Sequence, residues 1–403
     1  MHVLGDSEIR LWGLDATTRL QRQLGPITQL RWLNNLNEVG PNDSVLLVRG
    51  DYLFEARTLN ALIDAGRGVL RCAADEGLAA ALVDGAAVPS AMNALESGDP
   101  GDFAVIEQAD AATFDGQLRK AEPPILEPIS AARRDALEAK LYGNAYKGVT
   151  DLVTKWWWPR PAKIVVGWCA AAGITPNAVT LTGLVLMLFA CWAFWTGHYA
   201  AGLIAGWIMT FLDTVDGKLA RVTIQSSRIG HVLDHGMDIV HPPFWYLFWG
   251  LSLAATMPAS APWFGWSVAT WCWLIFGGYV AGRLIEGAFH ALGDCSLFAW
   301  QPFDAYNRLI TARRNPCMII LTLCWAVGRP DWGFYLVALW TLISSGVILV
   351  RLAQAAVERL RSGPVQSWLA DPERARAEHP EAFARFSGTR SAYGAAAGDL
   401  PQG

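Results

Sequence analysis

The stretch that decides the fold reads DTVDGKLARVTIQSSRIGHVLDHGMD (213–238). It holds four carboxylates in two pairs, spaced three and four residues apart: Asp213, Asp216, Asp234 and Asp238. Residues at these spacings lie on one face of a helix. Ala220 continues the first face and Gly230 begins the second. Two helix ends joined near 222–228 would therefore bring all four carboxylates together.

Carboxylates within apolar helices need a compensating charge. Each charged side chain costs about 2.5–3.5 kcal/mol at the centre of a bilayer, and neighbouring carboxylates raise each other's pKa. Oxygen ligands favour hard cations, so we expect Mg²⁺ or Mn²⁺ here, with Ca²⁺ as an alternative. Another interpretation is that the aspartates cap helices or pair with nearby basic residues, namely Lys218, Arg221 and Arg228.

The chain around this stretch is strongly apolar. Hydrophobic residues make up 53% of the 403 residues and charged residues only 17%, against about 25% charged in an average soluble domain. Six apolar runs are candidates to span a bilayer, which takes about 20 residues: 177–197, 199–221, 229–256, 262–289, 315–328 and 331–355. The sequence thus predicts an all-α membrane domain over 140–361, with six transmembrane helices.

An interfacial helix is expected before the first span. Lys147, Asp151 and Lys155 recur every four residues and precede Trp156–Trp158. A shared polar face followed by tryptophans is typical of a helix on the membrane surface. We expect Lys147 and Lys155 to contact lipid headgroups.

Basic residues predict the orientation in the membrane. Lys and Arg gather at the connections that would follow the second, fourth and sixth spans, and the opposite connections hold only Arg329. The positive-inside rule then makes the N-terminal domain, the aspartates and the tail cytoplasmic. The N-terminus, MHVLGDSEIR, lacks the pattern of a signal peptide. The net charge of −4 gives no indication of nucleic-acid binding.

Two further regions flank the membrane domain. Residues 1–135 are expected to form a soluble α/β domain, with a helix over 56–66 that ends at a glycine. Short apolar runs predict its strands: 44–54, 68–73 and 103–108. Ala-rich stretches between the strands are expected to be helical, which implies a mostly parallel sheet. The tail, 364–403, is rich in Ala, Gly, Pro and charge, so little fixed structure is expected there.

The aspartate stretch also resembles a known signature. It reads Asp213-x2-Asp216-Gly217-x2-Ala220-Arg221-x8-Gly230-x3-Asp234-x3-Asp238, which is similar to that of the CDP-alcohol phosphotransferase family. The resemblance covers roughly 140–360 and implies transfer of a phosphoalcohol group from a CDP-alcohol donor to a hydroxyl acceptor in phospholipid biosynthesis, with release of CMP. It also implies two metal ions, and a homodimer is common in the family.

The resemblance assigns roles residue by residue. Asp213, Asp216 and Asp234 would hold the metal ions, and Asp238 would be a fourth ligand or the base that takes the acceptor proton. The remaining motif positions would bind the CDP donor together with Asp213: Gly217, Ala220, Arg221 and Gly230.

The acceptor side is less defined. Arg283, Arg313 and Arg314 are candidates to bind an acceptor phosphate. The alternatives are an ion pair between Arg283 and Glu286, and simple positive flanking of a membrane helix by the other two. His231, His235 and His241 flank the aspartate face, and His241 is expected to be part of the polar lining of the same cavity, with an acceptor contact as the alternative. The donor could be CDP-diacylglycerol used on a polar alcohol such as inositol phosphate or glycerol phosphate, or a soluble CDP-alcohol used on a lipid hydroxyl.

The N-terminal segment LLVRGDYLF (46–54) resembles the element of nucleotidyltransferases that carries a metal-binding aspartate, here Asp51. The Gly-rich nucleotide loop of those enzymes is missing, since the first fifteen residues hold only Gly5 and Gly13. A phosphate cradle needs closely spaced backbone amides. We therefore expect this domain to be inactive in nucleotidyl transfer.

Two other functional classes remain open at this stage. Carboxylates in a membrane domain can form an ion or proton pathway, and the membrane domain could be a mere anchor. A pathway would spread acidic residues over several helices. Here all four lie within 26 residues beside a basic connection, which favours an enzyme.

Overall fold

The computed structural model describes residues 1–25, 30–225, 228–257 and 262–388. Within α8, the side chains of residues 228–235 and of Asp238 are outside the described set. The chain forms two compact units. The first comprises Met1–Asp115, Ala121–Ala145 and Arg221–Gln225, and the second comprises the rest, including the short loop Gly116–Lys120.

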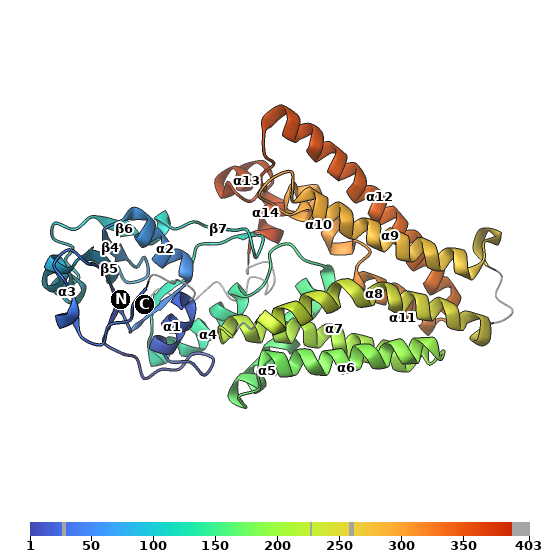
Figure 1. Cartoon of the computed structure of the whole chain (residues 1–403), viewed down its shortest axis with the longest axis horizontal. Coiled ribbons are helices and arrows are strands. Elements are labelled where there is room, and N and C mark those ends of the chain that lie inside the picture. Colours follow the sequence, from blue (N-terminus) through green and yellow to red (C-terminus); the bar gives the residue numbers. More distant parts are fainter. Residues whose placement is uncertain (26–29, 226–227, 258–261, 389–403) are drawn as a thin grey trace. The chain divides into compact units, whose positions relative to one another are not determined.

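A five-stranded sheet forms the centre of the first unit (Figure 1), in the order β1 (His2–Leu4), β2 (Ser44–Arg49), β5 (Leu78–Asp84), β4 (Gly68–Arg71) and β6 (Val105–Glu107). The β1–β2 and β4–β6 pairs are parallel, and β5 is antiparallel to both of its neighbours. The expectation of a mostly parallel sheet was therefore wrong. The reason is the Ala-rich stretch 78–84, which was expected to be helical and instead forms the central strand β5.

Burial explains why that stretch is a strand. Leu78 and Ala79–Ala81 have no exposed surface, because side chains on both faces of β5 are covered. Helix α3 (Val88–Ser97) packs on one face, and α1 (Ala16–Leu24) and α2 (Ala56–Ala65) pack on the other. The predicted helix 56–66 is confirmed as α2, which ends at Gly66 with a φ of 89°. The predicted strands at 44–54, 68–73 and 103–108 are confirmed within a few residues.

Smaller elements complete the first unit and the connection to the second. Two two-stranded sheets pair β3 (Tyr52–Phe54) with β9 (Leu126–Pro128) and β7 (Phe114–Asp115) with β8 (Lys120–Ala121). Helix α4 spans Arg134–Asn144. The predicted helix with Lys147, Asp151 and Lys155 on one face does not form after α4. The Asp151 carboxylate instead accepts hydrogen bonds from the backbone N–H groups of Val153 and Thr154, so a new helix starts at this residue.

The second unit is mainly helical. Its long elements are α5 (Pro159–Ala171), α6 (Pro176–Trp195), α7 (Tyr199–Val222, whose last two residues belong to the first unit), α8 (Arg228–Thr256), α9 (Val268–Phe289), α11 (Arg314–Ala326) and α12 (Pro330–Ser362). Each of the six predicted spans falls on one of these helices. Three of them, α6, α9 and α12, are long and apolar enough to cross a membrane. At 13 residues α11 is about 20 Å long, against about 30 Å of hydrocarbon, so six full spans remain a prediction.

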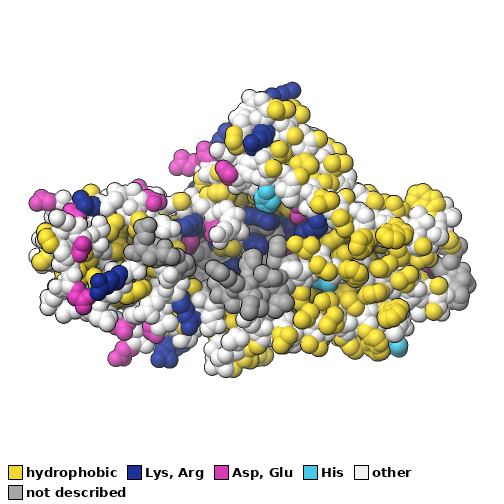
Figure 2. Space-filling view, in the orientation of Figure 1, with side chains coloured by type: hydrophobic (Ala, Val, Ile, Leu, Met, Phe, Trp, Pro, Cys, Tyr) yellow, Lys and Arg dark blue, Asp and Glu magenta, His cyan; other side chains and the backbone are white. Residues whose placement is uncertain are grey.

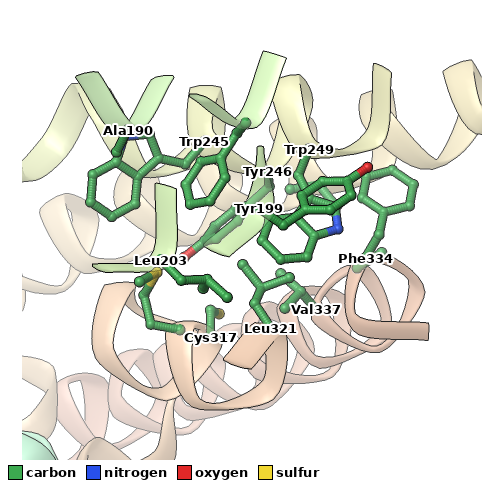
Figure 3. Packing of buried hydrophobic residues seen from close by; sticks show 14 of the residues in the cluster. Ala190, Tyr199, Leu203, Trp245, Tyr246, Trp249, Cys317, Leu321, Phe334 and Val337 are labelled. Atoms are coloured by element: carbon green, nitrogen blue, oxygen red, sulfur yellow. The ribbon is translucent and has the colours of Figure 1, made fainter. Parts of the chain in front are cut away.

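The helical unit has an aromatic core and an apolar exterior. Trp245, Trp249 and Trp271 are fully buried and pack with Phe334 and Tyr335; Figure 3 shows side chains of this cluster from α6, α7, α8, α11 and α12 facing one another. Figure 2 shows hydrophobic side chains over much of the helical surface. Trp192, Trp195 and Trp273 are each more than half exposed. A large exposed apolar surface indicates lipid contact, and the chain is an integral, multi-pass membrane protein.

The tail differs from expectation. Helices α13 (Pro372–Glu378) and α14 (Pro380–Phe386) follow α12, and Val365, Leu369 and Phe386 are buried. Little fixed structure was expected from the composition, and this is wrong for residues 365–388 because these few apolar side chains anchor the segment. Residues 389–403 are outside the described part of the chain.

Candidate active site

Helix α7 holds the first two aspartates. Its sequence before Asp213 is a proline-free apolar run, and the helix continues through the aspartates to Val222. Asp216 is only 5% exposed, and the Thr180 hydroxyl of α6 donates a hydrogen bond to its Oδ2 at 2.7 Å. The same hydroxyl lies 3.1 Å from the Pro176 carbonyl. The start of α6 therefore fixes the orientation of the Asp216 carboxylate.

Asp213 is paired with an arginine from a distant part of the sequence. The Arg314 guanidinium, at the start of α11, donates to Asp213 Oδ2 at 2.5 Å. Arg313 is the N-cap residue of the same helix. Positive charges at a helix N-terminus are opposed by the helix dipole. Their position is better explained by carboxylate partners than by the helix itself.

The other half of the motif lies on α8. Gly230, Asp234 and Asp238 belong to this one helix, as predicted, but their side chains are outside the described residues. Among the side chains that are described, no group of three His, Cys, Asp or Glu is close enough to hold a metal ion. The side chains of Asp234 and Asp238, two of the four expected ligands, are not among those described. Metal binding by the four aspartates therefore stays a prediction.

The residues present do fit a divalent cation. Asp213 and Asp216 offer oxygen ligands one helical turn apart, and the Asp216 carboxylate is buried and oriented by Thr180. Carboxylate oxygens are the ligands that a hard ion such as Mg²⁺ prefers.

The other predicted donor residues follow along α7. Gly217 and Ala220 lie on the helix beyond Asp216, and the Arg221 guanidinium donates to the Ala145 carbonyl at 3.3 Å. Lys218 is 4% exposed, and its ammonium group lies 3.7 Å from the centre of the Tyr146 ring. Sequence reasoning gave Lys218 only a charge-pairing role, whereas the structure places it over an aromatic face.

The three predicted acceptor residues separate into two groups. Arg314 contacts Asp213, as described above. Arg283 lies 3.6 Å from Glu286 on α9, and Arg313 also pairs with Glu286. The ion pair that the spacing of Arg283 and Glu286 suggested is therefore present, but a second arginine shares the carboxylate.

Sequence reasoning missed a neighbouring polar group. Arg308, on α10 (Pro302–Ile310), lies 4.0 Å from Asp151. Asn315 donates to Asp151 Oδ1 at 2.9 Å across 164 residues of sequence. Lys155, expected at the lipid headgroups, is 2% exposed and donates to the Gly148 carbonyl at 2.7 Å. No local spacing signals these contacts, because each joins segments that only the fold brings together.

In the first unit, the Asp51 carboxylate is bound by Arg49, two residues earlier in the chain. Arg49 donates to both carboxylate oxygens, at 2.9 and 2.6 Å. This hydrogen bonding raises the pKa of Arg49. A two-pronged guanidinium–carboxylate pair is strong and directional. It occupies the oxygens that a metal would need.

Comparison with known proteins adds a family match. Residues 173–282 match the sequence model of the CDP-alcohol phosphatidyltransferase family. The chain is similar to Cholinephosphotransferase 1 of Xenopus laevis, with 30% identity over 29% of this chain and 30% of the relative. The human protein of that name is 30% identical over 34% of this chain and 35% of its own length.

An archaeal relative matches over a shorter segment. The Archaetidylinositol phosphate synthase of Pyrococcus horikoshii is 40% identical over 17% of this chain and 37% of its own length. The match thus covers about a third of the length of each of these curated relatives. The family match runs from the start of α6 into α9 and includes the whole aspartate motif. Through this segment, the chain is similar to the CDP-alcohol phosphatidyltransferase family.

Proposed function

We propose that the chain is a membrane-embedded CDP-alcohol phosphotransferase that depends on a divalent metal and releases CMP. The observation that carries the proposal is the pair Asp213 and Asp216 on α7, with Asp216 buried and oriented by Thr180. This pair lies within the segment that matches the family. Phosphoryl transfer depends on positioning and charge neutralisation, and buried, oriented carboxylates suit both.

The proposed reaction is a displacement at phosphorus. The acceptor hydroxyl oxygen forms a bond to the phosphorus that carries the donor alcohol, the bond from that phosphorus to the bridging oxygen of the diphosphate breaks, and CMP leaves. Asp213, Asp216, Asp234 and Asp238 would hold the metal ions, of which the family resemblance implies two. When bound, such ions would neutralise the negative charge of the diphosphate and of the leaving group.

The chain's own residues supply the remaining steps. The Asp238 carboxylate takes the proton of the acceptor hydroxyl. Gly217, Ala220 and Gly230 leave space for the cytidine beside the helix backbone, and Arg221 contacts the diphosphate. Arg314 balances the charge of Asp213 and binds the acceptor with Arg283 and Arg313.

The substrate pair is proposed from the basic residues. Guanidinium groups match phosphate oxygens, so we propose CDP-diacylglycerol as donor and a phosphorylated polar alcohol as acceptor. A relative is named for an inositol phosphate lipid and others for choline phosphate transfer. Because other relatives are named for choline phosphate transfer, the second candidate is the reverse pair, a soluble CDP-alcohol as donor and a lipid hydroxyl as acceptor. A cytoplasmic active site and a homodimer complete the proposal.

An assay of the full-length protein in detergent tests this function. CMP release is measured for a panel of CDP donors and alcohols, with and without excess chelator. We expect release that requires Mg²⁺ or Mn²⁺ and is lost in Asp213→Asn. Metal-dependent ion flux in proteoliposomes without CMP release from any donor would instead indicate a transporter. Unchanged CMP release in excess chelator would contradict the metal mechanism.

A further inference from the structure

The connection between the two helices that carry the aspartate motif begins within the first unit. Helix α7 ends at Val222 and α8 begins at Arg228, and the segment Arg221–Gln225 belongs to the first unit. Val222 and Thr223 are only 1% and 6% exposed. The end of α7 is therefore buried among residues of that unit.

Two arginines of α1 bind the carbonyl groups at the end of α7. The Arg19 guanidinium donates to the Val222 carbonyl at 3.1 Å, and the Arg22 guanidinium donates to the Thr223 carbonyl at 2.6 Å. The last carbonyls of a helix have no partner within it, and they form the negative end of its dipole. The two guanidinium groups therefore cap α7 from another segment of the chain.

The Arg19 side chain is buried at this contact. Arg19 is 3% exposed, and its guanidinium also donates to the Leu11 carbonyl at 2.8 Å. Burial and the nearby charge of Arg22 lower the pKa of Arg19 to about 10, while Glu138 opposes that shift, so the group is charged at neutral pH. A buried charge is costly unless polar groups satisfy it, and the negative end of α7 does so here.

The turn after α7 has an unusual backbone conformation. Ile224 has a φ of 48°, in the left-handed region that is a rare position for a β-branched residue. Glycine commonly occupies such a position after a helix. Strain of this kind persists only where the surrounding structure imposes it. The Thr223 carbonyl belongs to the peptide bond that precedes Ile224, so its hydrogen bond with Arg22 fixes the orientation of that peptide.

The segment held in this way joins the two halves of the aspartate motif. Asp213 and Asp216 lie near the end of α7, and Asp234 and Asp238 follow near the start of α8. Their relative placement depends on the direction in which the chain leaves α7. Functional groups must be held to within about 0.5 Å of the productive geometry, so a change at this turn would separate the two pairs.

We propose that Arg19 is a positioning residue, through which the first unit fixes the end of α7 and the turn at Ile224, and thereby the relative placement of the two aspartate pairs. The inference rests on the proposed function, since it assumes that the two pairs hold the metal ions together. It gives a role to a unit that we expect to be inactive in nucleotidyl transfer. Apart from Arg221–Gln225, that unit lies outside the family match.

Binding of Mn²⁺ to the full-length protein in detergent, measured by electron paramagnetic resonance, tests this inference without turnover. Arg19→Met removes the guanidinium but keeps an unbranched side chain. It should weaken Mn²⁺ binding by about tenfold, as for other residues that support metal ligands. Arg19→Lys keeps a charged donor and should weaken binding less. The matched control is Arg31→Ala, which removes an exposed guanidinium of the same unit that pairs with Glu38; the affinity should be unchanged.

Arg22 provides a second variant at a half-buried position, which is needed if Arg19→Met does not fold. Arg22→Ala should also weaken Mn²⁺ binding, because the peptide before Ile224 loses its partner. Adding Ile224→Gly to Arg22→Ala should restore part of the affinity, since glycine adopts the left-handed conformation without strain. A double variant that binds Mn²⁺ no more tightly than Arg22→Ala alone would overturn the proposed role of the turn.

Three further measurements separate positioning from stability. Backbone amides of residues 217–225 should exchange hydrogen faster in Arg19→Met, because the end of α7 opens more often. In the CMP assay, kcat should fall by up to about a hundredfold, while the acceptor KM changes little. A lower melting temperature with unchanged Mn²⁺ affinity and unchanged kcat would mean that Arg19 only stabilises the first unit, and it would overturn the proposal.

This inference and the proposed function can fail separately. If the wild-type protein releases CMP and Arg19→Met changes neither the Mn²⁺ affinity nor kcat, the positioning role is wrong and the proposed function stands. If no donor yields CMP but Arg19→Met still weakens Mn²⁺ binding, the proposed function is wrong and the positioning role stands. Wild-type protein that binds no Mn²⁺ would contradict both.

Discussion

Two charged regions of the helical unit are assembled in opposite ways. The aspartate motif comes from 26 consecutive residues on two successive helices. The arginine cluster, here Arg283, Arg308 and Arg313 with the carboxylates of Glu286 and Asp151, draws on α9, α10, the start of α11 and a segment before α5. The first region can be recognised from spacing alone, whereas the second exists only in the folded chain.

The family match follows the same division. It contains all four aspartates but ends at residue 282, immediately before Arg283. No member of the arginine cluster lies within it. Under the proposed function, the matched segment would hold the donor side of the site, and the proposed acceptor residues Arg283, Arg313 and Arg314 lie outside it.

The largest expected effect tests the aspartate side. Asp216→Asn removes a buried, oriented carboxylate, and excess chelator removes the cation that it would hold. Both should abolish detectable CMP release, because the loss of charge neutralisation affects every turnover. The exposed Asp294, changed to Asn, is the matched control and should leave the rate unchanged. Substantial CMP release by Asp216→Asn would remove that residue from the site.

Asp238 tests whether the motif contains a base as well as ligands. General-base catalysis contributes about a hundred- to ten-thousandfold, so Asp238→Asn should lower kcat by a factor in that range. Donor affinity should change little, because three other carboxylates remain. Binding of a CDP donor and kcat are measured on the same preparation. A normal kcat would show that Asp238 is neither the base nor an essential ligand.

The arginine cluster should show a smaller effect of a different kind. Arg313→Ala removes a guanidinium that pairs with Glu286 and should raise the acceptor KM by about ten- to a hundredfold, with little change in donor affinity. Arg313→Lys should restore the acceptor KM only in part, since an ammonium group cannot form the two parallel hydrogen bonds of a guanidinium. If correctly folded variants at Arg283, Arg313 and Arg314 all keep a normal acceptor KM, the acceptor is a neutral polyol or a lipid hydroxyl.

The smallest effect is expected in the first unit. The protein incubated with CTP and a phosphorylated alcohol should form no CDP-alcohol, because Arg49 occupies the Asp51 carboxylate and the Gly-rich loop is missing. Asp51→Asn should accordingly leave CMP release by the helical unit unchanged. Pyrophosphate release from CTP that is lost in Asp51→Asn would show that this unit is an active nucleotidyltransferase.

The sequence by itself determined the features that depend on neighbouring residues. The six long apolar segments predicted the positions of α6 to α9, α11 and α12, because an apolar segment in a bilayer must satisfy its own backbone hydrogen bonds, as a helix does. Gly66 correctly marked the end of α2. The spacing of Asp213 and Asp216 placed them one turn apart on α7, because helical periodicity is local.

Only the tertiary structure decided the features that depend on distant contacts. Residues 78–84 became a strand because the centre of the sheet buries both of their faces, although alanine favours helices. Asp151 left its expected helix face and binds Asn315. Residues 365–388 were ordered by a few buried apolar side chains. The Gly148 N–H donates to the Leu118 carbonyl of a loop whose local sequence, GQLRK, carries no signal of this partner. In each case, burial and polar contacts between remote segments outweighed the local preference for secondary structure. The spacing of neighbouring residues does not predict such contacts.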